Sequence, residues 1–475
     1  MTPARTHTRI VAAFAAALML SACQTFSPDG GMSVTTSLAD RQLGKDAMAI
    51  RTADDAGIAR TRIERLLKRA LTADNAVQIA LLNNRGLQAA YNELGIAEAN
   101  MVAESLPPNP RLSISRIASA ADVEIERRLV ADILALATLP ARAEVAQDRF
   151  RQAQLRAAGE TARIAAAARR AYYRAVASQQ LTGLLVEAQS SAATAAKLAT
   201  RLGESGALNK LNQAREQVFY AETTAQLAGA RQRASSDREQ LTRVMGLWGD
   251  DLAFKLPANL PALPSRVRAL PAIERDAIDH RVDVQIARIE VEALAKSLGL
   301  TQATRFVNVL EVGGIAKTTR SADRTTDRPR GVEVELQVPL FDFGETRLRE
   351  AEQTYMQAIN RLAEKAVNVR SEARDSYRSY RSSHEIASHY QREVLPLRKI
   401  ISDEMMLRYG AMQIDVFPLL AEQRQRIGSS VAAIEAQRNF WLASTDLSAA
   451  IIGGGAPNTE ATNTTMPAAS NGAGH

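Results

Sequence analysis

Residues 332–340 read VEVELQVPL, and this stretch decides the fold. Every second residue, beginning with Val332, is apolar, and Glu333, Glu335 and Gln337 stand between the first four of them. A period of two indicates a β-strand with one apolar and one polar face. The strand is expected over residues 332–341, which is long enough to cross a bilayer when tilted. An apolar row toward lipid and an acidic row toward water are typical of a strand in a membrane barrel.

A very long helix is expected directly after this strand, from Gly344 to a break at Gly410. Its apolar residues recur every seven positions, which is the period of a coiled coil. At 1.5 Å per residue, about 65 residues make a rod of roughly 100 Å, longer than a compact domain accommodates. Two offset stripes predict contacts with neighbours on both sides: Leu348, Tyr355, Leu362 and Val369, then Ile359, Ala366, Ala373, Tyr380 and Ala387.

The same order of elements occurs twice, as helix, strand, strand, long helix, glycine turn and returning helix. The sequence therefore predicts a mainly α fold with a small membrane β part. The expected units are a first repeat over 58–250, a linker over 251–271, a second repeat over 272–452 and a disordered tail over 453–475. Helices are expected over 72–106, 140–202, 208–245, 273–300, 345–410 and 414–452, and strands over 112–117, 123–134, 306–316 and 332–341. Thr72 is the expected N-cap of the first of these helices.

The N-terminus predicts export and a lipid anchor. Arg5 and Arg9 precede a short apolar run, which fits a signal peptide over residues 1–22 and is too short for a mature transmembrane helix. The run ends in Leu-Ser-Ala before Cys23, an arrangement similar to a bacterial lipobox. Acylation, with palmitate among the expected chains, would hold Cys23 in one leaflet. A chance cysteine after an ordinary signal peptide is the plainer explanation. Residues 23–57 are expected to form an extended tether.

Composition argues against two other classes of protein. The net charge of +7 and pI near 9.6 could suggest a nucleic-acid partner, but the basic residues are interspersed with acids and form no basic block. No phosphate loop, nucleophile motif or metal-binding motif is present, so no enzyme activity, cofactor or metal site is predicted. His384 and His389 lie five residues apart and do not share a helix face well.

Several short motifs resemble the TolC-type outer-membrane efflux family. They are LTADNAVQIALLNN at 71–84, LPPNP at 106–110, HRVD at 280–283, VPLFDFG at 338–344 and, past the second turn, Gly410 with DVF at 415–417. The resemblance covers roughly residues 58–452. It departs from the family pattern at Ala70, where a proline is common, and at Val307, where the third strand usually begins with a proline-containing sequence.

The resemblance implies a homotrimer with a shared twelve-stranded β-barrel in the outer membrane and an α-helical barrel in the periplasm. It further implies a periplasmic adaptor (membrane fusion) protein and an inner-membrane pump, for which the RND class is a candidate. Gln24, rather than Asp, after the cysteine implies sorting to the outer membrane. The two helix turns would meet the adaptor through Arg201, Leu202, Gly203, Ser205, Gly206, Tyr409, Gly410 and Met412.

Asp415 matches the position at which the family places acidic residues around a closed pore. Three copies would form a cation-attracting ring, whose mutual repulsion is relieved by dilation or by ion binding. A helix N-terminal charge explains the same residue equally well. The predicted function is therefore an efflux channel for drugs or metal ions, and a periplasmic coiled-coil scaffold or adaptor lipoprotein without a pore is the alternative.

Overall fold

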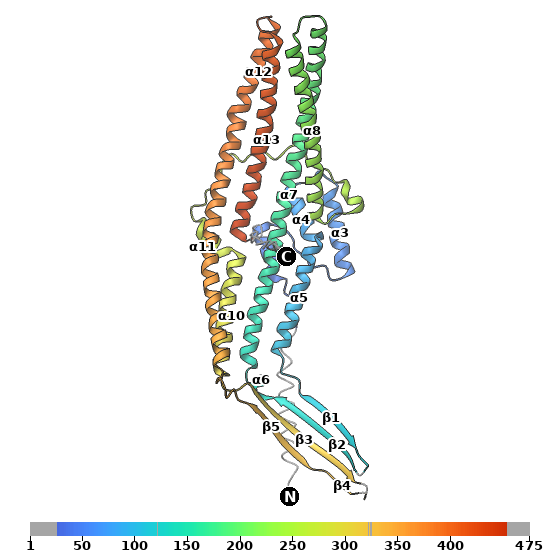
Figure 1. Ribbon diagram of the computed structural model, residues 1–475, viewed down its shortest axis with the longest axis vertical. Coiled ribbons are helices and arrows are strands. Elements are labelled where there is room, and N and C mark those ends of the chain that lie inside the picture. Colours follow the sequence, from blue (N-terminus) through green and yellow to red (C-terminus); the bar gives the residue numbers. More distant parts are fainter. Residues whose placement is uncertain (1–25, 121, 322, 324, 454–475) are drawn as a thin grey trace, which may run out of the picture.

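The molecule is a long rod with helices at one end and a small sheet at the other (Figure 1). The computed structural model describes residues 26–120, 122–321, 323 and 325–453. Both helix turns lie at the end opposite to the sheet, and shorter helices lie beside the middle of the rod (Figure 1). Cys23 and almost all of the tail over 453–475 lie outside the described residues.

The first repeat has the predicted order of elements. Its long helix α7 contains 66 residues, or about 100 Å, and begins with Pro140 in its first turn. The elements are α4 (Ala73–Asn83), α5 (Arg85–Ser105), β1 (Arg111–Ala118), β2 (Asp122–Asp132), α6 (Ile133–Ala137), α7 (Leu139–Glu204) and α8 (Lys210–Met245). The side chain of Thr72 accepts a hydrogen bond from the Asn75 amide, so this predicted N-cap is confirmed.

The second repeat follows the same order. Its long helix is continuous over 345–410 but carries a π-helical turn before Pro396, because proline lacks the amide that an α-helix needs. The elements are α9 (Ile273–His280), α10 (Val282–Ala303), β3 (Val309–Ser321), β4 (Thr326–Asp327), β5 (Arg330–Gln337), α11 (Glu345–His389), η4 (Tyr390–Val394), α12 (Leu395–Gly410) and α13 (Val416–Ile452).

Strands of the two repeats join in one antiparallel sheet. The order is β1, β2, β3, β5, and the two-residue β4 pairs with the outer end of β3. Strand β2 of the first repeat pairs with β3 of the second over eleven residues, from Asp122 opposite Ser321 to Asp132 opposite Glu311. In the described part of the chain, β1 and β5 are therefore the two edges of an open sheet.

Small side chains let the helices pack closely. Most of the buried residues of α7 are alanines, which explains the composition, and α7 packs against α4, α5, α8, α10 and α13. On α11 the later members of one heptad stripe, Ala373, Tyr380 and Ala387, are fully buried, whereas Leu348 and Tyr355 are only half-buried. The beginning of the other stripe, at Leu348 and Tyr355, is thus only half covered within a single chain.

Two predicted helices are interrupted. The helix expected over 72–106 ends at Asn83 and restarts at Arg85, because Asn84 adopts an extended backbone and caps the second segment through the Leu87 amide. The helix expected over 273–300 is also interrupted, at Arg281, whose backbone is extended but whose side chain does not cap the second segment. The third strand, expected over 306–316, begins at Val309 and continues to Ser321. The fourth ends at Gln337 rather than near residue 341.

The expectation of an extended tether is wrong for much of residues 26–57. This segment forms α2 (Ser33–Leu38), η2 (Ala39–Leu43) and the start of α3 (Ala53–Leu67), with Met32 and Ala39 buried. Two glutamine side chains hold the stretch between them: Gln78 exchanges two hydrogen bonds with the backbone of Asp46, and Gln88 bonds the Met48 carbonyl and the Ile50 amide. These side chains thus provide hydrogen-bond partners for backbone groups that lie outside any helix or strand.

The proline-rich linker binds the two repeats together at the middle of the rod (Figure 1). After η3 (Gly249–Ala253), it places the Pro261 carbonyl where Gln437 and the Trp441 indole of α13 donate to it. Trp441 also stacks on Tyr173 of α7, with ring centroids 5.2 Å apart. The linker is therefore an ordered strap rather than a flexible connection.

Candidate functional site

The sheet has two chemically different faces. Directly opposite residues of antiparallel strands project to the same side, so the register assigns each strand residue to a face. The first, called the apolar face here, carries an exposed hydrophobic row on each of β1 and β5, with Val332 79% exposed. Its apolar members are Leu112, Ile114, Val123, Ile125, Leu129, Ala131, Leu310, Val312, Val332, Val334 and Leu336.

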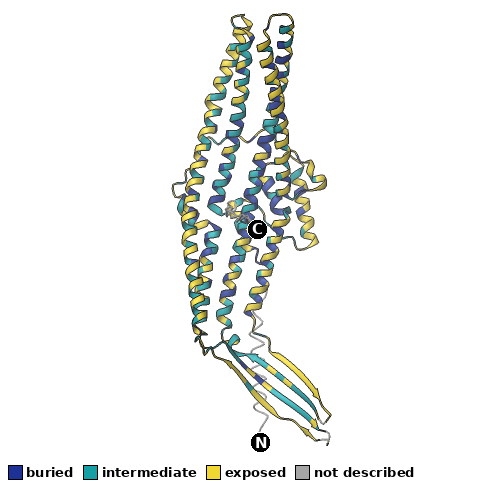
Figure 2. Ribbon diagram, viewed as in Figure 1, coloured by how far each residue is buried: buried dark blue, intermediate teal, exposed yellow. Residues whose placement is uncertain are grey.

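Exposed aromatic residues lie where the sheet meets the helices. Phe306 precedes β3, and Phe341 and Phe343 lie in the turn between β5 and α11. Aromatic girdles of this kind mark the level of a membrane interface in barrel proteins. Figure 2 shows that the edge strands β1 and β5 are largely exposed, whereas β2 and β3 are mostly of intermediate exposure.

The opposite side, called the charged face here, is dominated by acidic residues. Three of its ion pairs cross between strands: Lys317 Nζ lies 2.6 Å from Glu124, Arg128 contacts Glu333, and Arg111 pairs with Glu311. Arg128 also contacts Glu126 on its own strand. Its acids are Asp122, Glu124, Glu126, Asp132, Glu311, Glu333 and Glu335, and its bases are Arg111, Arg128 and Lys317. The net negative charge suits a water-filled space that attracts cations.

At the other end of the rod, the first turn joins α7 and α8. Gly206 has φ +76°, a conformation that favours glycine, whereas Gly203 lies inside α7. A Cβ at Gly203 would meet the end of the flexible Gln213 side chain at 2.7 Å, so Gln213 would have to shift to admit it. Arg201, Ser205 and Gly206 are exposed, and Leu202 and Gly203 are partly exposed.

The second turn joins α12 and α13, and it differs from the prediction. Gly410 is the last residue of α12, and Met412, 94% exposed, takes the left-handed conformation with φ +59°. A methionine there stores strain, because its Cβ is crowded in this region. Asp415 is exposed and caps α13 by accepting a hydrogen bond from the Val416 amide at 2.7 Å. The cap geometry fits the plainer explanation of Asp415, while its charge and exposure remain available for a pore.

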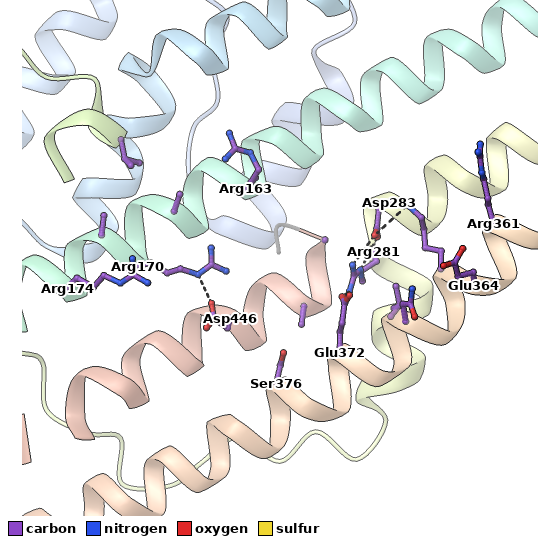
Figure 3. A pocket seen from close by; sticks show the side chains of 18 of the residues that line it. Arg163, Arg170, Arg174, Arg281, Asp283, Arg361, Glu364, Glu372, Ser376 and Asp446 are labelled. Carbon is purple, nitrogen blue, oxygen red and sulfur yellow. Dashed lines mark hydrogen bonds and ion pairs between the residues drawn. The ribbon is translucent and has the colours of Figure 1, made fainter. Parts of the chain in front are cut away.

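A cavity of about 1080 Å³ lies where α13 ends and α10 begins, between α7 and α11 (Figure 3). Its charged groups largely pair with one another. Arg170 Nε lies 2.5 Å from Asp446, and the buried Arg281 bonds both Asp283 and Glu372. Arg281 thus explains the HRVD motif as a joint between α10 and α11 within the second repeat, whereas the Arg170–Asp446 pair joins the two repeats. The cavity shows no catalytic arrangement.

The remaining candidates have structural roles. His384 bonds the Pro264 carbonyl at 2.9 Å and packs edge-on against Phe440, so it belongs to the central strap. In the part of the chain that the structure describes, His, Cys, Asp and Glu side chains form no cluster suited to a metal ion. Among the same residues, no helix is both long and apolar enough to span a membrane.

Comparisons with known proteins agree with this geometry. No family model matches the chain. The chain is 24% identical over 292 residues to the cobalt-zinc-cadmium resistance protein CzcC of Cupriavidus metallidurans, an alignment that covers 59% of this chain and 66% of that protein. It thus spans just under two thirds of that relative's length.

Solved structures match over more of the chain. The structure of CusC, described in terms of transmembrane channel formation, has a TM-score of 0.66 at 16% identity, covering 81% of this chain and 92% of CusC. The open state of the Neisseria gonorrhoeae outer-membrane channel MtrE has a TM-score of 0.64 at 16% identity, covering 80% and 88%. The chain has the TolC-type fold of outer-membrane channels. The proteins compared are channels and a resistance protein, and none is named as an enzyme.

The TolC-type fold brings together residues that lie far apart in the sequence, and it contains contacts that the sequence did not indicate. Predicted tip residues of both repeats lie at the same end of the rod (Figure 1). The face of each residue on β2 was not assignable from sequence, because charged residues fall on both sides of this strand. The strap contacts of Pro261 were also missed, and no local pattern signals them, since their partners lie on a helix far along the chain.

Proposed function

We propose that this protein is the outer-membrane channel subunit of a tripartite efflux system, through which solutes delivered by a pump and an adaptor leave the cell passively. One observation carries the proposal: a four-strand path of sheet with an apolar face, a charged face and two free edges. An open sheet with these faces buries neither its apolar side nor its edges alone. A closed barrel with water inside and lipid outside would cover the apolar face with lipid and pair both edges.

Three copies give the required cylinder. Strands alternate in direction along the path, so β5 of one copy would run antiparallel to β1 of the next. The edge strands are eight residues each, and the two-residue β4 lies outside this path. Three copies of β1, β2, β3 and β5 then give twelve strands, an even number that fits a barrel. The half-buried heptad stripe on α11 would find its partner in the neighbouring chain, completing the helical barrel.

The lipid anchor at Cys23 fits the position of the first described residues. Ser27 is held by two hydrogen bonds to Glu98, seven residues before α5 ends beside the sheet. Seven helical residues rise about 10 Å. The four-residue step back to Cys23 reaches up to about 14 Å, so the acylated cysteine can lie in the periplasmic leaflet. Replacing Cys23 with Ser should abolish incorporation of a palmitate analogue.

The tip is proposed as the adaptor contact, because most of its residues are exposed and Met412 is held in a strained backbone conformation. Met412→Gly relieves the left-handed strain and removes the side chain. The turn should then be at least as stable, and adaptor binding should be weaker. A variant that binds the adaptor as the parent does would contradict this role of Met412.

Asp415 is proposed to line the pore at this end. Asp415→Asn keeps the N-cap, since asparagine caps as well as aspartate, and removes only the charge. Asp415→Asn should therefore alter the conductance and leave the stability unchanged. Equal conductance would leave the helix cap as the whole role of Asp415.

The cargo is proposed to be cationic, with metal ions favoured over drugs. The support is the name of the relative, a cobalt-zinc-cadmium resistance protein, together with the acidic excess on the charged face. The pump and the adaptor are then expected to be those of a metal-resistance system.

The experiment is reconstitution of the purified mature protein. Its mass in detergent should be that of a trimer, its gel mobility should change on heating, and it should conduct ions in a planar bilayer. A monomer without conductance would support the scaffold lipoprotein instead.

A further inference from the structure

The apolar face changes character toward the outer end of the sheet. Three successive cross-strand rows nearest the helices contain only apolar residues and glycine, ending with Leu112, Leu129, Gly314 and Val332. The next three rows on the same face introduce arginine in each. Four exposed arginines, called the arginine collar here, stand among these rows: Arg116, Arg127, Arg320 and Arg330.

The members of the arginine collar have no acidic partner among the described residues. Neither a hydrogen bond nor an ion pair reaches any of their guanidinium groups there. On the opposite face of the same strands, Arg111, Arg128 and Lys317 are all paired with glutamates. The register also places no acidic residue on the collar's face. The sheet therefore separates charge, with unpaired cations outside and an acidic excess inside.

The spacing of the arginine collar fits a membrane boundary. From Phe341 at the base to Val332 the chain advances nine residues, which span at most about 30 Å, and the part from Gln337 onward lies in β5. With a tilt of about 40° this is at most roughly 23 Å across the bilayer, just under the apolar band of about 25 Å in membrane barrels. Arg127 and Arg330, in the row after Val332, then lie at the outer interface rather than within hydrocarbon.

We infer that the arginine collar binds the phosphate groups of glycolipid headgroups in the outer leaflet. The inference rests on the proposed function, which sets the sheet across the outer membrane with its tip hairpins in the periplasm. A guanidinium offers a planar fork that matches phosphate oxygens in bidentate fashion. Unpaired arginine is costly in hydrocarbon and favourable beside anionic headgroups, which add affinity for each basic residue near the surface.

Arg127 and Arg330 form the core of the site. Both are opposite Ala316 of β3, so they stand in one row on either side of a small residue. Neighbouring strands lie about 4.8 Å apart, which puts the two Cα atoms roughly 10 Å from each other. Two long side chains over an alanine leave room for one phosphate between their guanidinium groups.

The test uses the full mature trimer in phosphatidylcholine vesicles with and without lipid A carrying its two phosphates. Dephosphorylated lipid A shows whether the phosphate is what binds, and inorganic phosphate at equal concentration serves as the soluble source. The variant is Arg127→Gln with Arg330→Gln. The matched control is Arg65→Gln with Arg69→Gln, two exposed arginines near the end of α3 without ion pairs among the described residues.

The parent and the control should bind phosphorylated lipid A and dissociate into monomers at a higher temperature in its presence. The collar variant should bind roughly thirtyfold more weakly, as expected for two lost contacts beside an anionic surface. Arg127→Lys with Arg330→Lys should recover part of the binding, because charge remains without the fork.

If the variant forms a conducting trimer and binds phosphorylated lipid A as tightly as the parent, the inference is overturned and the proposed function is not. An equal rise in the trimer's dissociation temperature with dephosphorylated lipid A, or with inorganic phosphate alone, would overturn it too. Failure to form a trimer or a pore in any vesicle would overturn the proposed function, and the inference with it.

Discussion

Arg424 of α13 donates a hydrogen bond to the buried carboxylate of Glu216 on α8, and thereby joins the hairpins of the two repeats near the tip. The guanidinium also lies 4.6 Å from the centre of the Phe219 ring. Among the described residues, Glu216 Oε2 and Arg424 Nε have no partner. The contact is a charged pair that is only half satisfied, held between the two hairpins near the tip.

Removing one member of this pair should destabilise the tip. Arg424→Gln leaves the Glu216 carboxylate buried without its cation, a cost of about 1–2 kcal/mol once discounted because the Arg424 side chain is about a third exposed. The thermal unfolding midpoint should fall. The double variant with Glu216→Gln should recover most of the loss, since no buried charge remains. A double variant as unstable as the single one would show that the pair does not act through charge.

The two faces of β5 should respond oppositely to the same new charge. Val334→Lys puts an ammonium on the apolar face and costs about 2–4 kcal/mol near the middle of a bilayer. Trimer formation in membranes should drop sharply. Glu335→Lys, one residue along, places the same side chain on the charged face opposite Glu311, and assembly should continue. Equal loss in both variants would argue that the apolar face does not meet lipid.

The acidic excess of the charged face should make the pore cation-selective. In a salt gradient, Glu333→Gln with Glu335→Gln should move the reversal potential toward zero, because two negative groups per chain leave the lumen. Replacement of both by Asp keeps the charge and should keep the selectivity. If the two glutamine substitutions leave the reversal potential unchanged, these residues lie outside the conduction path.

The local sequence pattern was sufficient to predict the helices and strands that keep a regular period of apolar residues. The strand at Val332 alternates strictly, and the alanine-rich helices keep a heptad period, so their types were predictable. Strand β2 was harder, since Arg127 and Arg128 sit side by side and only pairing with β3 shows which one faces the acids.

The N-terminal segment and the second turn could not be predicted for a different reason. Residues near Met48 are held by Gln78 and Gln88 side chains that come later in the chain, so nothing local signals order. At the tip, Gly410 suggested a glycine turn, but the left-handed residue is Met412. Strain of this kind contradicts propensity and is found where a function requires it.

Stability at high pH should depend on Tyr91. Burial raises the pKa of Tyr91 to about 12 from its usual value near 10, with its hydroxyl 2.9 Å from Thr161. The folded protein holds this proton more tightly than the unfolded chain. Stability is therefore intact below pH 10 and falls as the pH rises from about 10 through 12. Tyr91→Phe should therefore flatten this part of the plot of the thermal unfolding midpoint against pH.

The closure of three chains through their edge strands is tested most directly by cysteine cross-linking. Cys23 is the only native cysteine, so a Cys23→Ala background is free of thiols. Ser113→Cys on β1 is combined in turn with Glu333→Cys, Glu335→Cys or Gln337→Cys on β5. Within one chain these strands are separated by β2 and β3, roughly 14 Å, which is too far for a disulfide.

Oxidation in membranes should convert one of these combinations into covalent dimers and trimers, and the single-cysteine variants should give no trimer. The trimer should be the largest product, because a closed ring leaves no free edge. Monomers alone in every combination, or an open ladder beyond three chains, would contradict the shared twelve-stranded cylinder.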